Sequence, residues 1–305
     1  MEVPASEGYA RYLDPRMLAK IAGLDLRARL VVEGYVTGMH RSPYHGFSVE
    51  FAEHRQYAPG DDVKHMDWKV YGRTDKLYVK QYEEETNLTC MLVVDCSESM
   101  GYKSDPEGLS KHEYGATAAA AIAYLALHQQ DAVGLATFDE GISRFMRPSN
   151  NPAHWKTLIH EMERNLGPKK TSMRSVLTDL AERVQRRTLI VVISDLFDNP
   201  TRLIQGLRKL RYRKHEVIIL QIMDPQELEF TFRGPVLFEG LEQTGRLFTD
   251  AGGLRGRYRE EVDKFLATVR RACRNLRIDY SVFDTSKSLD ASLTTFLVNR
   301  SSHLK

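Results

Sequence analysis

Apolar runs that stop abruptly at polar residues alternate with segments of helical periodicity after residue 88. Short valine- and isoleucine-rich runs predict buried strands, and apolar positions three and four residues apart predict helices. Continuous apolar strands separated by helices are typical of a parallel sheet covered on both faces. We therefore predict an α/β fold with a mostly parallel sheet. The expected strands are 91–94, 132–138, 143–146, 189–193, 217–222 and 278–283, and the expected helices are 112–130, 155–166, 173–184, 201–213, 254–276 and 291–298.

The first 88 residues follow a different pattern. Asp14-Pro15 is typical of a helix start, with an N-cap followed by proline at the first helical position. Between Gly34 and Glu85, apolar and polar residues alternate in two stretches, which indicates strands. These stretches cover residues 47–51 and 77–82. We predict two domains, an N-terminal helix with a β-rich module over 1–88 and an α/β domain over 89–305.

Composition limits the classes of function. The chain has 305 residues, 42% of them hydrophobic, which is enough to bury a core without disulfides or metal staples. Its 43 basic and 41 acidic residues leave a formal charge of +2, so no global field favours nucleic acid. Two basic stretches, 208–214 and 270–271, fall near the C-terminal ends of expected helices, where cations complement the helix dipole. We expect no nucleic-acid partner.

The three cysteines form no CxxC pair, which favours a reducing compartment. The N-terminal residues lack the basic and apolar regions of a signal peptide. No stretch approaches the ~20 apolar residues that a membrane span needs. We expect a cytoplasmic protein without a membrane span.

Candidate chemistry gathers where two expected strands end. In the sequence CMLVVDCSESM, a strand stops at Asp95, and Ser97 and Ser99 follow at alternate positions. Asp195 comes directly after the strand 189–193 and Ser194. Ligands of open α/β sheets lie outside the carboxyl ends of strands, and oxygen ligands suit Mg²⁺ or Mn²⁺, or Ca²⁺. Because Asp and Ser also favour turns and caps, the motif alone leaves a metal site and a turn cluster both open.

Two resemblances extend this motif. Residues 95–100, Thr171 six residues before Leu177, and Ser194-Asp195 resemble the metal-ion-dependent adhesion site of von Willebrand factor A domains. Upstream, the chain resembles the signature of the domain-of-unknown-function family numbered fifty-eight, whose members pair that region with a von Willebrand factor A-like domain. The residues that resemble this signature are 34–46, 51–62, 65–68 and 72–73.

The resemblance implies a set of ligands. Ser97, Ser99 and Thr171 would offer hydroxyls to the cation, and Asp95 and Asp195 would bind it directly or through water. An open coordination position would accept a carboxylate from a partner, so the site would act as a metal-dependent docking point. The family resemblance implies a MoxR-type AAA+ ATPase as that partner, in the assembly or maturation of other proteins.

One departure bears on this implied site. Lys169-Lys170 stand where many such domains have glycines before the threonine. A nearby ammonium either weakens cation binding by repulsion, leaving a vestigial site, or helps to attract an acidic partner.

Further residues are candidates for partner binding. Glu98, Lys170 and Asp198 stand near the proposed site, where extra acidic residues are typically outer-sphere supports of a metal centre. Upstream, a cluster of charged residues has two interpretations, a network of ion pairs that joins the β-rich module to the sheet or a partner-binding surface. This cluster includes Arg55, Asp67 and Arg73, together with Asp61, Asp62 and Trp68.

The alternative function is a metal-dependent hydrolase, phosphatase-like, with Asp95 as its nucleophile. Phosphatases of the haloacid-dehalogenase type place a general-acid aspartate two residues after the nucleophile, and Ser97 stands there instead. The sequence also lacks Walker A, GxGxxG and GxSxG motifs. We expect a binding module that is not an enzyme.

Overall fold

The computed structural model describes residues 14–21, 23–39, 54–56, 72–73, 78–80, 88–163, 172–239 and 245–303. Its contacts divide the chain into two units, residues 1–40 with 88–305, and residues 41–87. In the smaller unit, β1 (His54–Gln56) and β2 (Tyr78–Lys80) pair antiparallel, with Arg55 opposite Val79. Strand β2 lies within the stretch predicted at 77–82, whereas the stretch predicted at 47–51 lies outside the described residues.

This grouping places residues 1–40 with the larger unit, whereas the predicted division runs at residue 88. The larger unit contains α2 (Pro15–Ala19), which starts as predicted because the Asp14 side chain accepts a hydrogen bond from Arg16 N at 2.8 Å. It also contains α3 (Leu24–Met39). The prediction that the β-rich segment begins at Gly34 is therefore wrong for residues 34–39. Buried side chains at Leu24, Ala28 and Val31 follow helical spacing, and packing of α3 on a core helix favours this conformation.

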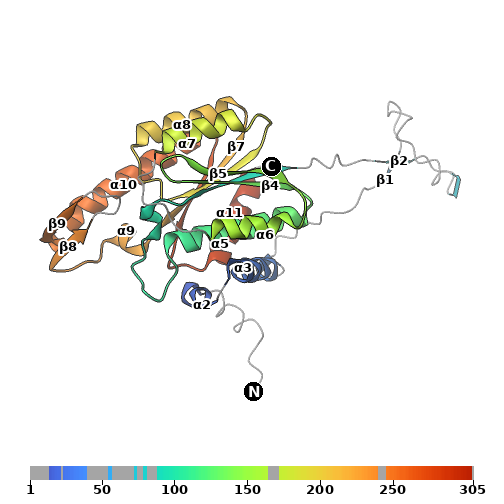
Figure 1. Ribbon diagram of the computed structural model, residues 1–305. Helices are drawn as coiled ribbons and strands as arrows, with labels where there is room; N and C mark the ends of the chain where they lie inside the picture. Colours follow the sequence, from blue (N-terminus) through green and yellow to red (C-terminus); the bar gives the residue numbers. More distant parts are fainter. Residues whose placement is uncertain are drawn as a thin grey trace, which may run out of the picture. The chain divides into compact units, whose positions relative to one another are not determined.

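A six-stranded sheet forms the centre of the larger unit (Figure 1). Its strand order is β10-β7-β6-β3-β4-β5, and all neighbours pair parallel except β5, which runs antiparallel to β4. The predicted fold class, α/β with a mostly parallel sheet, is confirmed. The strands are β3 (Thr89–Asp95), β4 (Ala132–Phe138), β5 (Ile142–Ser149), β6 (Leu189–Ser194), β7 (Glu216–Met223) and β10 (Asp279–Asp284).

Helices cover both faces of this sheet (Figure 1). Successive side chains of a strand point to opposite faces, so Leu92 and Val94 of β3 join one buried cluster, and Met91 and Val93 join the other. The first face packs against α5 (Lys111–His128), α6 (His154–Met162) and α11 (Leu289–His303), and α3 packs on these helices. The second face packs against α7 (Met173–Arg183), α8 (Pro200–Tyr212) and α10 (Ala251–Asn275).

Helix α5 lies against the middle of the sheet because its residues are small. Alanines 118–121 are fully buried, and a Cβ built on Gly115 would lie only 2.9 Å from Cγ2 of Ile193 in β6. The helix begins with a capping box in which the Ser110 side chain accepts from Glu113 N, and the Glu113 carboxylate accepts from Ser110 N. These contacts fix the first turn of α5 beside the carboxyl ends of the strands.

Two elements between β7 and α10 were not predicted. They are the short helix α9 (Pro225–Glu229) and the hairpin of β8 (Pro235–Glu239) with β9 (Arg246–Asp250). The hairpin exposes several large apolar side chains, at Leu237, Leu247 and Phe248. Among the described residues, no helix combines the length and the apolar character that crossing a membrane requires.

Candidate functional site

The candidate site lies where the strand order of the sheet reverses. In the sheet, β3 lies between β6 and β4. The chain passes from β3 to β4 and β5 on one side, and it then crosses to β6 on the other side of β3. Val94 pairs with Ile193 in parallel, so Asp95 and Ser194 end neighbouring strands at the same edge. This reversal is the usual ligand position of open α/β sheets. We call the surface around Asp95, Ser97 and Ser99 the docking edge.

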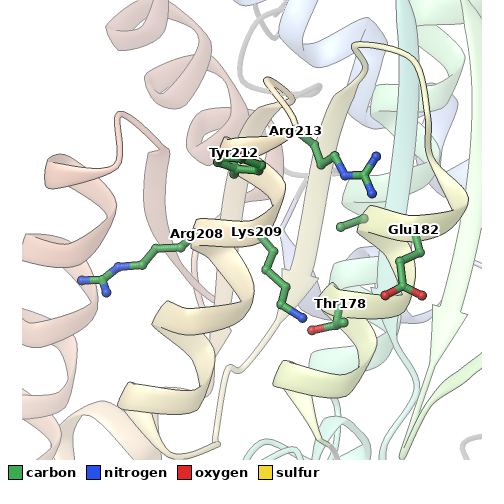
Figure 2. Close-up of a pocket in the computed structure, with 7 residues that line it drawn as sticks. Thr178, Glu182, Arg208, Lys209, Tyr212 and Arg213 are labelled. Carbon is green, nitrogen blue, oxygen red and sulfur yellow. The ribbon is translucent and has the colours of Figure 1, made fainter.

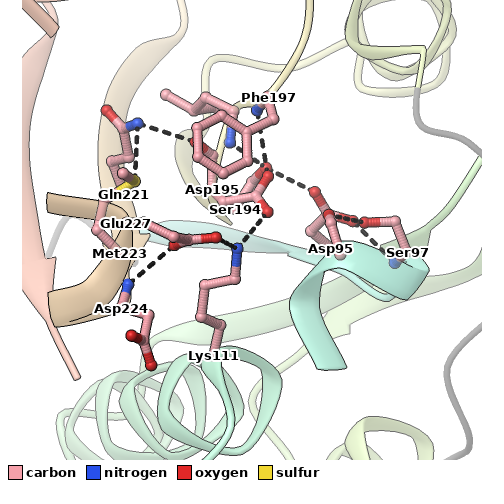
Figure 3. A network of polar contacts seen from close by, with 12 residues as sticks. Asp95, Ser97, Lys111, Ser194, Asp195, Phe197, Gln221, Met223, Asp224 and Glu227 are labelled. Carbon is pink, nitrogen blue, oxygen red and sulfur yellow. Dashed lines mark hydrogen bonds and ion pairs between the residues drawn. The ribbon is translucent and has the colours of Figure 1, made fainter. Parts of the chain in front are cut away.

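Asp95 is held by donors from both strand ends (Figure 3). Ser97 N donates to its Oδ1 at 2.9 Å, and Ser194 Oγ donates to its Oδ2 at 2.6 Å. The carboxylate is fully buried, and burial together with the negative charge of Asp195 raises the pKa of Asp95 to about 7. Its negative charge is therefore poorly compensated, and an added cation would stabilise it.

Two serine hydroxyls lie next to this carboxylate. Ser97 is fully buried, and Ser99 is half-buried in the short 3₁₀ helix η2 (Glu98–Gly101). Their Oγ atoms are hydrogen-bonded to each other at 3.1 Å. The turn after β3 thus points two neutral oxygens toward each other beside Asp95.

Asp195 pairs with a lysine that the sequence analysis missed (Figure 3). Nζ of Lys111 lies 2.8 Å from Oδ2 of Asp195 and 2.6 Å from Oε1 of Glu227, and the lysine is fully buried. Nζ also lies 4.9 Å from the centroid of the Phe197 ring. Burial alone would lower the pKa of Lys111, but the charges of Asp195 and Glu227 outweigh it, so the pKa is raised. Lys111 therefore stays an ammonium ion.

The rest of Asp195 and Glu227 is also engaged. Phe197 N donates to Oδ1 of Asp195 at 3.1 Å, and Gln221 Nε2 of β7 donates to the Asp195 carbonyl at 2.8 Å. Oε2 of Glu227 accepts from Asp224 N at 2.9 Å in the capping box of α9. Burial raises the pKa of Glu227. Both oxygens of the Asp195 carboxylate therefore already accept hydrogen bonds from the protein.

The oxygen atoms at the docking edge fit a hard cation, with one restriction. Asp95, Ser97 and Ser99 offer a carboxylate and two hydroxyls close together, as Mg²⁺ or Mn²⁺ would require. Asp195 is paired with the ammonium of Lys111, whose charge would repel a cation bound directly to this carboxylate, so contact through a water molecule is favoured. In the part of the chain that the structure describes, no three His, Cys, Asp or Glu side chains group as metal ligands. The ligand roles stay predictions.

The other predicted site residues lie in several places. Glu98 is half-buried at the start of η2, and Asp198 accepts from Met173 N at 2.9 Å, which ties the loop after β6 to the start of α7. Met173 follows Thr171 by two residues, but Thr171 lies outside the described residues, as do Lys169, Lys170, Asp67, Asp61, Asp62 and Trp68. Arg55 in β1 and the exposed Arg73 belong to the smaller unit.

A groove lies between α7 and α8 (Figure 2). It has a volume of about 450 Å³ and is lined by Thr178, Ala181, Glu182, Arg208, Lys209, Tyr212 and Arg213. The C-terminal end of α8 leads into β7, so this groove lies toward the amino ends of the strands, away from Asp95. Lys209 and Arg211 occupy the last turn of α8, in agreement with the expected dipole role.

Comparison with known proteins identifies relatives over most of the chain. The chain is similar to the uncharacterized protein Rv1480 of Mycobacterium tuberculosis (strain ATCC 25618 / H37Rv), with 28% identity over 295 residues, 94% of this chain and 90% of the relative. The uncharacterized protein Mb1516 of Mycobacterium bovis matches equally well.

Solved structures are similar at the level of the fold alone. They include the conserved hypothetical protein BatB from Bacteroides thetaiotaomicron, with a TM-score of 0.46, 11% identity, and coverage of 70% of this chain and 99% of that one. Another is the VWA domain of SpRpn10, with a TM-score of 0.38, 10% identity, and coverage of 68% of this chain and 94% of that one.

A family model described as "Protein of unknown function DUF58" matches residues 53–268. The chain belongs to the DUF58 family, as its upstream motifs predicted.

Proposed function

We propose that this chain is a non-enzymatic protein-binding module that takes its partner at the docking edge. One observation supports this most directly. A fully buried carboxylate, Asp95, lies beside the paired hydroxyls of Ser97 and Ser99 at the point where the strand order reverses. Such a group of oxygens, with a negative charge that its surroundings compensate poorly, would be stabilised by a bound cation.

The cation in this proposal is Mg²⁺, with Mn²⁺ or Ca²⁺ as alternatives. Asp95, Ser97, Ser99 and Thr171 would hold it, and Asp195 would support it through water. When bound, the cation supplies a positive charge to which a carboxylate of the partner can bind. Following the family resemblance, we propose a MoxR-type AAA+ ATPase as the partner, in the assembly or maturation of other proteins. The three free cysteines support a cytoplasmic site of action.

The hydrolase alternative is the weaker proposal because of the contacts of Asp95. Both of its oxygens accept hydrogen bonds from the protein, and the fully buried side chain is not accessible to a substrate of the size of a phosphate ester, which is far larger than a single cation. Ser97, two residues later, cannot act as a carboxylic general acid. These contacts favour a role in binding.

The test is the affinity of the full chain for its cognate MoxR-type ATPase. We expect EDTA, and separately the double substitution Ser97→Ala/Ser99→Ala, to weaken binding at least about tenfold relative to Mg²⁺-loaded wild type, or ~1.4 kcal/mol. Thr295→Ala serves as the control, because it also removes a hydroxyl but lies at an exposed position of α11. This variant should bind the ATPase like wild type. Unchanged affinity in EDTA and in the double variant would reject the docking edge and favour the surface of Arg55, Asp67 and Arg73.

A further inference from the structure

The proposed cation would share the docking edge with an ammonium ion that belongs to the protein. Lys111 is fully buried, and its Nζ contacts Asp195, one of the expected metal ligands, at 2.8 Å. None of the motifs in the sequence analysis includes this lysine. Two cations near one carboxylate repel each other, so the position of Lys111 has a direct consequence for metal binding.

The backbone of Lys111 is fixed from both sides. Lys111 is the first residue of α5, directly after the capping residue Ser110, and its main-chain N donates to Tyr102 O at 3.1 Å. A cation at a helix N-terminus is disfavoured by the helix dipole. Asp195 and Glu227 compensate for this, and together they hold Nζ between β6 and α9. The ammonium is therefore part of a built site and does not move freely.

The charges near Lys111 do not balance. Asp95, Asp195 and Glu227 provide three carboxylates, and Lys111 provides one ammonium, which leaves two negative charges when all four groups are ionised. Lys111 compensates Asp195 and Glu227, whereas Asp95 has hydrogen-bond donors but no ion pair among the described residues. A divalent cation would balance this charge, but only on the Asp95 side.

We infer that Lys111 is an internal counter-ion that competes with the divalent cation for Asp195 and keeps the affinity of the docking edge for metal low. This inference rests on the proposed function, because it concerns the same cation. A metal held by one carboxylate and neutral hydroxyls gains most from an additional carboxylate. The partner would supply that carboxylate, so cation and partner would each strengthen the binding of the other.

The experiment measures Mn²⁺ affinity of the full chain from the electron paramagnetic resonance signal of free Mn²⁺. Lys111→Met keeps the side-chain length and removes the charge, and we expect it to bind Mn²⁺ at least tenfold more tightly than wild type. The double variant Lys111→Met/Glu227→Gln removes one charge of each sign, so its net charge equals that of wild type. The double variant should also bind Mn²⁺ more tightly than wild type. It provides the test if the single variant does not fold. Lys103→Met removes an exposed ammonium that donates only to the carbonyls of Pro106 and Gly108, and it should match wild type.

The results separate this inference from the proposed function. Tighter binding in both Lys111 variants supports the inference, even if wild type binds no Mn²⁺ and the proposed metal dependence fails. Wild-type binding with no gain in the Lys111 variants overturns the inference and leaves the proposed metal site intact. An equal gain in Lys103→Met would also overturn the inference, because the effect would then reflect overall charge rather than competition for Asp195.

Discussion

The buried carboxylate of Asp95 predicts an unusual dependence of stability on pH. Burial and the neighbouring charge of Asp195 raise its pKa from 3.8 to about 7 in the folded protein. The folded state therefore binds this proton more tightly than the unfolded state. The resulting stability is complete below about pH 4 and is lost as the pH rises through about 7. The perturbation that tests this is Asp95→Asn, which cannot ionise.

The magnitude follows from the shift in pKa. The rise in the pKa of Asp95 from 3.8 to about 7 corresponds to about 4 kcal/mol at most, and about 3 kcal/mol of this falls between pH 5 and pH 8. Urea unfolding in EDTA at these two pH values measures it. We expect wild type to lose about 3 kcal/mol more of its unfolding free energy than Asp95→Asn between the two pH values. Glu227, whose raised pKa acts in the same direction, is common to both proteins and cancels in the comparison.

Asp139→Asn is the matched control. Asp139 follows β4 at the same edge of the sheet and is half-buried, with Ser143 Oγ donating to its carboxylate. Its variant should keep the wild-type dependence on pH. If wild type and Asp95→Asn instead lose stability in parallel between pH 5 and pH 8, the carboxylate is not destabilised by burial, and the argument that a cation binds beside it fails.

The remaining predictions concern stability and use urea denaturation. Lys111→Met should lower the unfolding free energy by about 3 kcal/mol because it leaves buried carboxylates unpaired, and adding Glu227→Gln should recover part of the loss; a neutral single variant would contradict this. Ser110→Ala should cost about 1 kcal/mol through the lost cap of α5, and an unchanged midpoint would count against the capping box. Gly206→Ala should cost about 1–3 kcal/mol because its Cβ would lie 2.9 Å from the Leu177 side chain. Gly256→Ala meets open space in α10 and should gain up to about 1 kcal/mol, so equal effects of the two glycine substitutions would refute the packing argument.

The core of the larger unit could be predicted from the sequence because its pattern is local. The strand expected at 132–138 has those bounds in β4, and the strand expected at 189–193 is β6, which extends by one residue to Ser194. Each is an apolar run bounded by polar residues, so residue type alone specifies it. The hairpin of β8 and β9 was missed because its apolar side chains are half-buried or exposed, and its two strands are only five residues long.

The candidate site was only partly predictable. Asp95, Ser97, Ser99 and Asp195 could be found because they stand at the ends of recognisable strands. Lys111 could not, because its partners are 84 and 116 residues away in the sequence. A signal was nevertheless present. The S-x-x-E capping pattern of residues 110–113 places Lys111 at the start of a helix whose many alanines indicate burial, and a lysine there requires a carboxylate partner.

The antiparallel edge strand β5 limits how another chain can pair with one side of the sheet. An exposed sheet edge invites strands from other molecules, but β5 is irregular in its pairing with β4, with register shifts near both of its ends. It also exposes Arg144 and Arg147, and Pro148 has no N–H to donate. Strand addition along this edge is therefore disfavoured. On the β5 side of the sheet, a partner would therefore contact loop side chains at the strand ends and would not share backbone pairing.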